Sequence, residues 1–244
     1  MKSSLMTDTA VAATALAADS HGHDDHHAHP DYLAHHFDTP KQQFDAAKIG
    51  MWSFLVQEIL FFSGVFVAYG VFRSWYPETF SAASQQLNPI MGGTNTVVLL
   101  FSSLTAALAV RSSALGRQKE TTRWIVLTIL CACIFLVVKY FEYAHKFEAG
   151  LLPGKYFHPH ASHLVPGSAA LPANSHVFFS IYFMATGIHG IHVLVGIGVF
   201  SWILKRNLRN DFKQYNAGVD MTALYWHLVD LVWIYLFPLM YLID

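Results

Sequence analysis

The sequence is poor in charged residues, which make up 13% of its 244 residues, while 54% are hydrophobic. Soluble domains carry about 25% charged residues. This balance predicts an integral membrane protein and argues against a soluble one. The formal net charge of −1 says little by itself, and we expect no nucleic-acid partner.

Cysteine is nearly absent, and the two that occur, Cys131 and Cys133, lie two residues apart in an apolar stretch. On a helix, residues with this spacing point to different sides. The spacing excludes a disulfide between them and a CxxC metal or redox motif. We interpret both as small packing residues.

The first 47 residues lack a long apolar run. The segment TAVAATALAA at 9–18 ends in an A-x-A-like pattern, but its centre is weakly hydrophobic and Asp8 precedes it, so we expect no signal peptide. The histidines that follow (HGHDDHHAHP at 21–30, then His35 and His36) could bind a transition metal. Without flanking structure to fix a geometry, they favour a solvated, mostly disordered tail. We predict a tail at 1–47 and a membrane domain at 48–244.

Five segments are long and apolar enough to cross a bilayer, for which a helix needs about 20 residues. The predicted spans are 50–72, 94–115, 124–143, 175–204 and 221–243. The predicted fold is therefore all-α, a polytopic membrane helical bundle with five transmembrane helices. Two polar loops, 73–93 and 146–174, separate the spans on one side. The second loop holds His158, His160 and His163, which resemble a metal site only loosely, because no fourth ligand is apparent.

Basic residues are distributed unevenly between the two ends of the spans. One end has Lys2, Lys41, Lys48, Arg111, Arg117, Lys119, Arg123, Lys205, Arg206, Arg209 and Lys213, and the other has Arg73, Lys146 and Lys155. Because cytoplasmic loops are enriched in Lys and Arg, this predicts a cytoplasmic N-terminus and an external C-terminus. The odd number of spans agrees with that orientation.

An acidic residue, Glu58, interrupts the first span. A carboxylate at the bilayer centre costs about 2.5–3.5 kcal/mol on insertion scales, so we expect Glu58 to face the protein interior and to be protonated. Two interpretations stay open. Glu58 is either a neutral group that packs by hydrogen bonding to another helix, or a functional site for a proton or a lipid headgroup.

Further polar residues lie within the later spans: Glu142, His189, His192, His227 and Asp230. Glu142 shares a helix side with Lys139, which we expect to reach toward the membrane interface. Members of the pairs His189–His192 and His227–Asp230 are three residues apart and share a helix face.

These pairs have two possible roles. Paired histidines from two helices could ligate haem or a metal, and Asp230 could fix the tautomer of His227. The alternative is hydrogen bonding between helices that approach closely at glycines. Those glycines are Gly187, Gly190, Gly196 and Gly198. A transporter is less favoured, because five spans show no visible repeat symmetry.

Five stretches, in this order, resemble subunit III of the haem–copper oxidases of the cytochrome c oxidase type. They are WSFLVQEILFFSG at 52–64, NTVVLL at 95–100, KYFEYAHKF at 139–147, FMATGIHGIHVLVG at 183–196 and LYWHLVDLVWIYLF at 224–237. The resemblance covers about residues 48–243, and the last two motifs are highly specific. Many members have seven helices, and this chain is similar to a shorter form that lacks the first two.

The resemblance implies an accessory role in a bacterial cytoplasmic membrane. Subunit I of such oxidases carries the haems and copper, so no catalytic residue, metal or cofactor is expected in this chain. Its expected partners are subunits I and II and phospholipids held in a cleft. By resemblance, Glu58 matches an intramembrane glutamate, and Arg206 and Arg209 match positions that meet lipid phosphates. The alternatives are subunit III of a quinol oxidase, a free-standing membrane transporter and a b-type haem protein.

Overall fold

The structure is a computed structural model that describes residue 37 and residues 39–166, 171–209 and 217–243. Residues 1–46 and 47–244 form two separate units. The tail histidines at 21–36 lie outside the described residues, so the interpretation of the tail stays a prediction. Residues 40–47, which we assigned to the tail, are already helical.

Five long helices dominate the described chain, and all are long and apolar enough to cross a membrane. They are α2 (Pro40–Trp75), α4 (Pro89–Ala114), α5 (Gln118–Glu148), α6 (Ser175–Leu208) and α7 (Ala217–Tyr241). The all-α, five-span prediction is confirmed. The helices mostly extend past the predicted spans, because hydropathy marks the apolar centre of a helix and not its polar terminal turns.

A short helix, α3 (Pro77–Ser84), occupies part of the predicted loop 73–93. Pro77 begins it, which suits a proline because the first helical N–H has no partner in the helix. Its Phe80 is fully buried and packs edge-on against Tyr69 and Phe178, with ring centroids 5.4 and 5.3 Å away. The sequence did not predict α3 because we took its proline as a loop signal.

The start of α4 also lies earlier than predicted, at Pro89 and not at 94. Asn88 caps the helix, and its side-chain oxygen accepts hydrogen bonds from the backbone N–H groups of Ile90 (3.0 Å) and Met91 (3.3 Å). Such a cap satisfies N–H groups that no helical carbonyl can reach. Residues 88–93, with a proline and two glycines, therefore begin a helix despite their loop-like composition.

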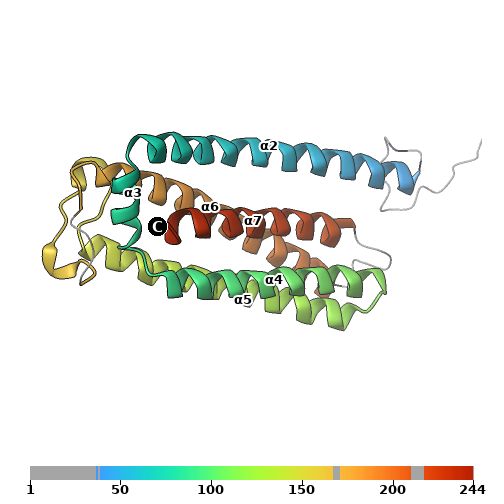
Figure 1. Cartoon of the computed structure of the whole chain (residues 1–244). Helices are drawn as coiled ribbons and strands as arrows, with labels where there is room; N and C mark the ends of the chain where they lie inside the picture. The colour runs from blue at the N-terminus through green and yellow to red at the C-terminus, as the bar shows by residue number, and fades with distance from the viewer. Residues whose placement is uncertain (1–36, 38, 167–170, 210–216, 244) are drawn as a thin grey trace, which may run out of the picture. The chain divides into compact units, whose positions relative to one another are not determined.

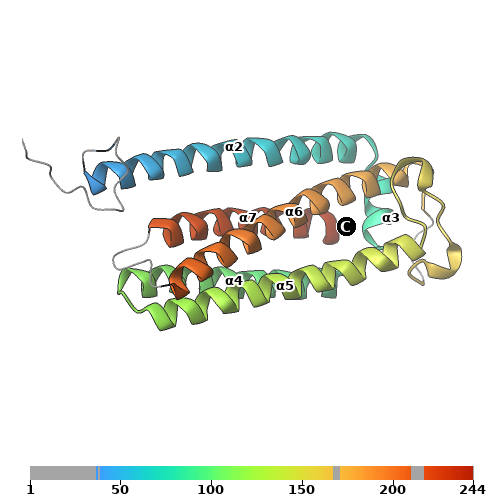
Figure 2. The ribbon, with the colours of Figure 1, turned by 180° about the vertical axis from the view of Figure 1, so that it is seen from behind.

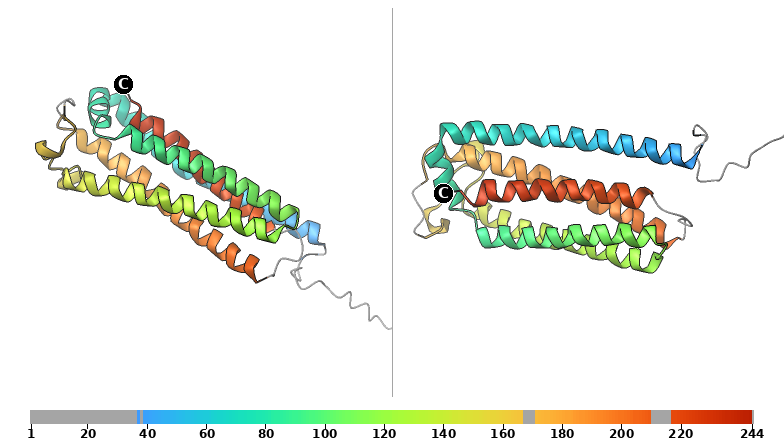
Figure 3. Two further views of the ribbon diagram at one scale, coloured as in Figure 1. Left: turned by 90° about the horizontal axis from the view of Figure 1, so that it is seen from below. Right: turned by 45° about the vertical axis from the view of Figure 1, so that its right-hand side comes forward.

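Helices α4, α5, α6 and α7 run side by side as an antiparallel bundle (Figures 1, 2 and 3). Helix α2 contacts α6 and α7 through long side chains, and its Tyr69 hydroxyl donates to the backbone oxygen of Leu239. Helix α3, the loop after α5 and the last turn of α7 lie together at one end of these helices (Figure 1). In that loop Gly150 has a φ of 71°, and a Cβ there would overlap the backbone oxygen of His158.

One of the four glycines of α6 permits a close helix contact. A Cβ on Gly196 would lie 2.5 Å from Cζ3 of Trp226, whose side chain is 1% exposed. Gly187 makes only an ordinary contact, and Gly190 and Gly198 face open space. The expectation that all four glycines bring helices together is therefore wrong, because the helix turns three of them away from α7.

We predict that Gly196→Ala lowers the free energy of unfolding by about 1–3 kcal/mol, the usual cost of overpacking a core. Trp226 is enclosed and cannot shift without disturbing α7. Gly198→Ala is the matched control and should not destabilise the protein, because alanine favours the helix and meets no neighbour there. Thermal unfolding in detergent compares the two variants, and equal melting temperatures would contradict the packing argument.

Candidate functional site

Glu58 of α2 pairs with His192 of α6. The Glu58 Oε2 atom lies 2.9 Å from His192 Nε2, and the side chains are 13% and 18% exposed. The other ring nitrogen, Nδ1, lies 2.8 Å from the backbone oxygen of Ile188. A carbonyl oxygen only accepts, so Nδ1 carries a proton, and one further proton lies between Nε2 and Oε2. The pair is either two neutral groups or an ion pair, with the same number of protons.

Aromatic side chains pack against the His192 side of this pair. The His192 ring packs against Phe62 and Phe61, with centroids 5.0 and 6.2 Å away. Tyr225 of α7 donates its hydroxyl to the backbone oxygen of His192 at 2.9 Å. The sequence singled out Glu58 and His192 separately but did not pair them, and it gave no signal for Tyr225.

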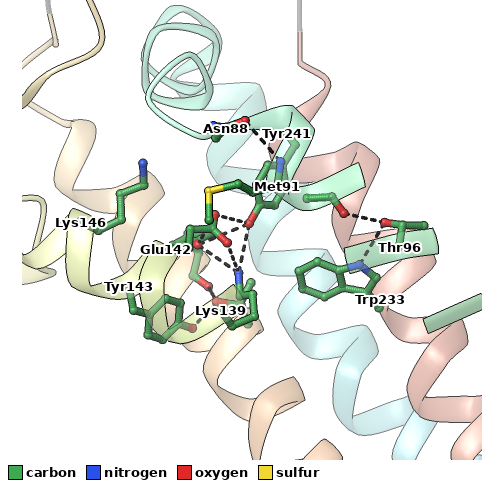
Figure 4. A network of polar contacts seen from close by, with 12 residues as sticks. Asn88, Met91, Thr96, Lys139, Glu142, Tyr143, Lys146, Trp233 and Tyr241 are labelled. Atoms are coloured by element: carbon green, nitrogen blue, oxygen red, sulfur yellow. Dashed lines mark hydrogen bonds and ion pairs between the residues drawn. The ribbon is translucent and has the colours of Figure 1, made fainter. Parts of the chain in front are cut away.

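Lys139 and Glu142 form a second cluster, which is buried at the end of the bundle near α3 (Figure 4). Lys139 Nζ donates to Glu142 Oε2 at 2.9 Å, to Tyr182 OH at 3.1 Å and to Tyr241 OH at 3.0 Å. Both tyrosine hydroxyls donate to Glu142 Oε1. Three helices, α5, α6 and α7, thus meet at one carboxylate.

The ammonium group of Lys139 is also enclosed by aromatic rings. It lies 5.0–5.7 Å from the ring centroids of Trp233, Tyr182, Tyr143 and Tyr241. Ring faces attract a cation that has lost its water. Our expectation that Lys139 reaches toward the interface is wrong, because the side chain is 8% exposed and satisfies its donors inside the bundle.

Two further interactions link elements at the same end. Lys146 of α5 donates to the backbone oxygen of Gln86, between α3 and α4. The Gln86 side chain accepts from the backbone N–H of Val165 at 3.0 Å. The long loop after α5 is thereby joined to the helices.

The remaining predicted polar residues do not form the expected pairs. His227 Nδ1 lies 2.6 Å from the Ser103 hydroxyl of α4 and makes no hydrogen bond to Asp230, although Ser103 also lies near the Asp230 carboxyl. Asp230 and His189 are buried, and their side-chain polar atoms have no hydrogen-bond partner among the described residues. His189 and His192 diverge, with His189 packed on Phe135 and Trp233.

The two arginines considered for lipid phosphates lie apart from these clusters, and the described residues offer no metal site. Within the described ranges, no group of three or more His, Cys, Asp or Glu side chains could hold a metal ion. At the end of α6, the Arg206 guanidinium lies 5.0 Å from the Trp202 ring centroid, and Arg209 is exposed.

Comparison with known proteins gives a consistent family. Residues 11–150 and 164–244 match the family model described as cytochrome c oxidase subunit III. The chain is 31% identical over 201 residues to the probable cytochrome c oxidase subunit 3 of Mycobacterium leprae, covering 80% of this chain and 87% of the relative. It is 33% identical over 204 residues to cytochrome c oxidase subunit 3 of Corynebacterium diphtheriae, with the same coverage. The corresponding protein of Synechocystis is 30% identical over 238 residues, covering 95% of this chain and 83% of the relative.

We predict that Glu142→Gln destabilises the protein by about 3–5 kcal/mol, because it leaves the Lys139 ammonium buried without a counter-charge. The matched control is Glu120→Gln, which breaks an ion pair of α5 whose side chains are 60% and 44% exposed. Exposed pairs contribute about 0–1 kcal/mol. Thermal unfolding of both variants in detergent measures the difference, and similar losses would show that the buried pair is not an important link.

Proposed function

The chain belongs to the cytochrome c oxidase subunit III family, and we propose that it is a non-catalytic subunit of a respiratory oxidase that reduces oxygen to water and pumps protons. It is a multi-pass membrane protein, and membership in the family implies oxidase subunits as its partners. We take these to be subunits I and II, with subunit I holding the haems and copper.

The supporting observation is how the intramembrane polar groups are used. Glu58, Glu142, His192 and His227 each hydrogen-bond to a different helix. Side chains that hydrogen-bond to another helix hold the helices together, and they do not point into an open site where a substrate could react. This arrangement supports a structural rather than a catalytic role for the chain, and we propose that the bundle so held stabilises subunit I.

The same geometry disfavours the b-type haem alternative. Haem ligation needs histidines with a free ring nitrogen on facing helices. His192 has no free ring nitrogen, because both are hydrogen-bonded. Among the described residues His189 has free nitrogens, but its fully buried ring is packed against Phe135 and Trp233, and His227 directs Nδ1 to Ser103 of α4. An optical spectrum of the purified chain tests this directly, since a Soret band would favour the haem protein.

We assign proton exchange and lipid contact to the Glu58–His192 pair. A proton can move between Oε2 and Nε2 without changing the net charge of the pair, which suits a group that receives and passes on protons. Both side chains stay partly exposed within the apolar span. The arginines at the cytoplasmic end of α6, Arg206 and Arg209, suit lipid phosphates, because a guanidinium can bind phosphate through two hydrogen bonds.

We predict that Glu58→Gln leaves initial oxygen turnover within about twofold, roughly 0.4 kcal/mol of barrier. The glutamine amide can still donate to His192 Nε2, so the helix contact survives, but the exchangeable proton is lost. The change should appear as slower proton uptake at high pH or a shorter inactivation half-life during sustained turnover.

All three quantities are measured on one preparation of the oxidase, with Glu120→Gln as a control for the loss of one exposed carboxylate. Abolished initial turnover with normal assembly would place Glu58 in catalysis. No change in any of the three would reduce Glu58 to a packing residue.

The location we propose is the cytoplasmic membrane of a bacterium, with the N-terminus inside. In a variant with Cys131 and Cys133 replaced by serine, a cysteine at Lys119 should react with an impermeant thiol reagent only from the cytoplasmic side. A cysteine at Ser162 should react only from outside. Both positions are exposed, in the first turn of α5 and in the long loop, and the opposite labelling would invert the topology.

A further inference from the structure

Three polar side chains in the middle of the bundle have no partner for any of their hydrogen-bonding atoms. Asn95 of α4 and His189 of α6 are 0% exposed, and Asp230 of α7 is 2% exposed. Their six side-chain nitrogen and oxygen atoms make no hydrogen bond of good geometry within the part of the chain that the structure describes. The Ser103 hydroxyl lies near the Asp230 carboxyl, but it bonds His227 at 2.6 Å. Leaving a buried donor or acceptor unsatisfied costs about 1–3 kcal/mol each.

Contacts between the helices bring two of them to the same level. The rings of Phe135, His189 and Trp233 pack on one another with centroids 4.9–5.4 Å apart. Trp233 also donates to the Thr96 hydroxyl at 3.1 Å. Asn95 is the neighbour of Thr96 in the chain and is buried, so it lies at this level too.

Asp230 lies about one turn away along α7. It precedes Trp233 by three residues and shares its helix face. Asp230 is also within electrostatic range of Cys131 of α5. Cys131 precedes Phe135 by about one helical turn, which places Asp230 one turn from the aromatic rings. One turn is a rise of about 5.4 Å, which two hydrogen bonds of about 2.8 Å each can span. One or two water molecules could therefore join the two levels.

We propose that Asn95, His189 and Asp230 bind ordered water at the centre of the α4–α7 bundle, with Asp230 present as the neutral carboxylic acid. Buried water typically makes about three hydrogen bonds to polar groups that otherwise lack partners. The amide, the imidazole and the carboxylic acid supply both donors and acceptors for it. This site belongs to the chain itself and does not depend on its place in an oxidase.

A metal ion fits the same residues poorly. The site offers an amide oxygen and one carboxyl group, whereas hard cations take six or more oxygen ligands. The Lys139 ammonium also lies within electrostatic range of His189, and its positive charge repels a cation there. A carboxylate without a partner would be costly in this interior, so the acid is the protonated form.

The direct test is a water-resolving map of the full-length protein purified with its native partners. We expect at least one ordered water within hydrogen-bonding distance of the Asp230 carboxyl and of either His189 or Asn95. The infrared difference spectrum of the wild type minus Asp230→Asn should contain a band of a protonated carboxylic acid, and this band should shift in D₂O. The proposal would be overturned by a map in which these side chains contact only protein atoms and no ordered water. A protonated-acid band of Asp230 that D₂O leaves unchanged would also overturn it.

A double-mutant cycle gives a second test. Substitutions at residues that are not in contact and share no partner have nearly additive effects on stability. Because His189 and Asp230 share water in this proposal, His189→Leu and Asp230→Leu together should lower the melting temperature by clearly less than the sum of the single losses. The control cycle pairs Asp230→Leu with Glu120→Gln and should be additive. Additive losses in the first cycle would contradict shared water, and if the variants fail to fold, the map decides alone.

Discussion

The structure depends on one constraint of the bilayer interior: every polar group must find its partner inside the protein, because hydrocarbon offers none. The constraint explains why the polar side chains of this chain join different helices. Lys139 and Glu142 of α5 hydrogen-bond to tyrosine hydroxyls of α6 and α7, and the Ser103 hydroxyl of α4 hydrogen-bonds to His227 of α7. Apolar side chains give these helices little reason to prefer each other over lipid, so the polar contacts set which faces meet.

The Lys139–Glu142 cluster and the Glu58–His192 pair therefore join different sets of helices. The Lys139–Glu142 cluster is almost fully enclosed and holds three helices of the bundle at one end. The Glu58–His192 pair is more exposed and joins α2 to α6, with Phe54–Tyr225 and Phe66–Tyr235 ring contacts along the same helix. A group that exchanges protons needs some access to its surroundings, whereas a structural ion pair is strongest without it. The difference in exposure therefore supports assigning exchange to Glu58 and structure to Glu142.

The sequence predicted the spans well, because length and hydropathy determine which segments can cross a bilayer. It also identified polar residues that the structure places within these long helices. It failed on their partners, because spacing along one helix shows which residues share a face and says nothing about the opposite helix. His192 was grouped with His189, but its partner is Glu58, 134 residues away. Lys139 was expected at the interface, since nothing in the sequence shows that four aromatic rings from α5, α6 and α7 surround it.

The motif FMATGIHGIHVLVG shows how one helix can direct one histidine into the bundle and another toward α2. Each residue turns a helix by about 100°, so His189 and His192 point about 60° apart. That offset is enough to direct His189 into the bundle against Trp233 and His192 toward α2. A spacing of four would give about 40° on the other side and move the second ring away from Glu58. The two histidines are thus not a pair of ligands: the three-residue spacing places one at an internal contact of α6 and the other at its contact with α2.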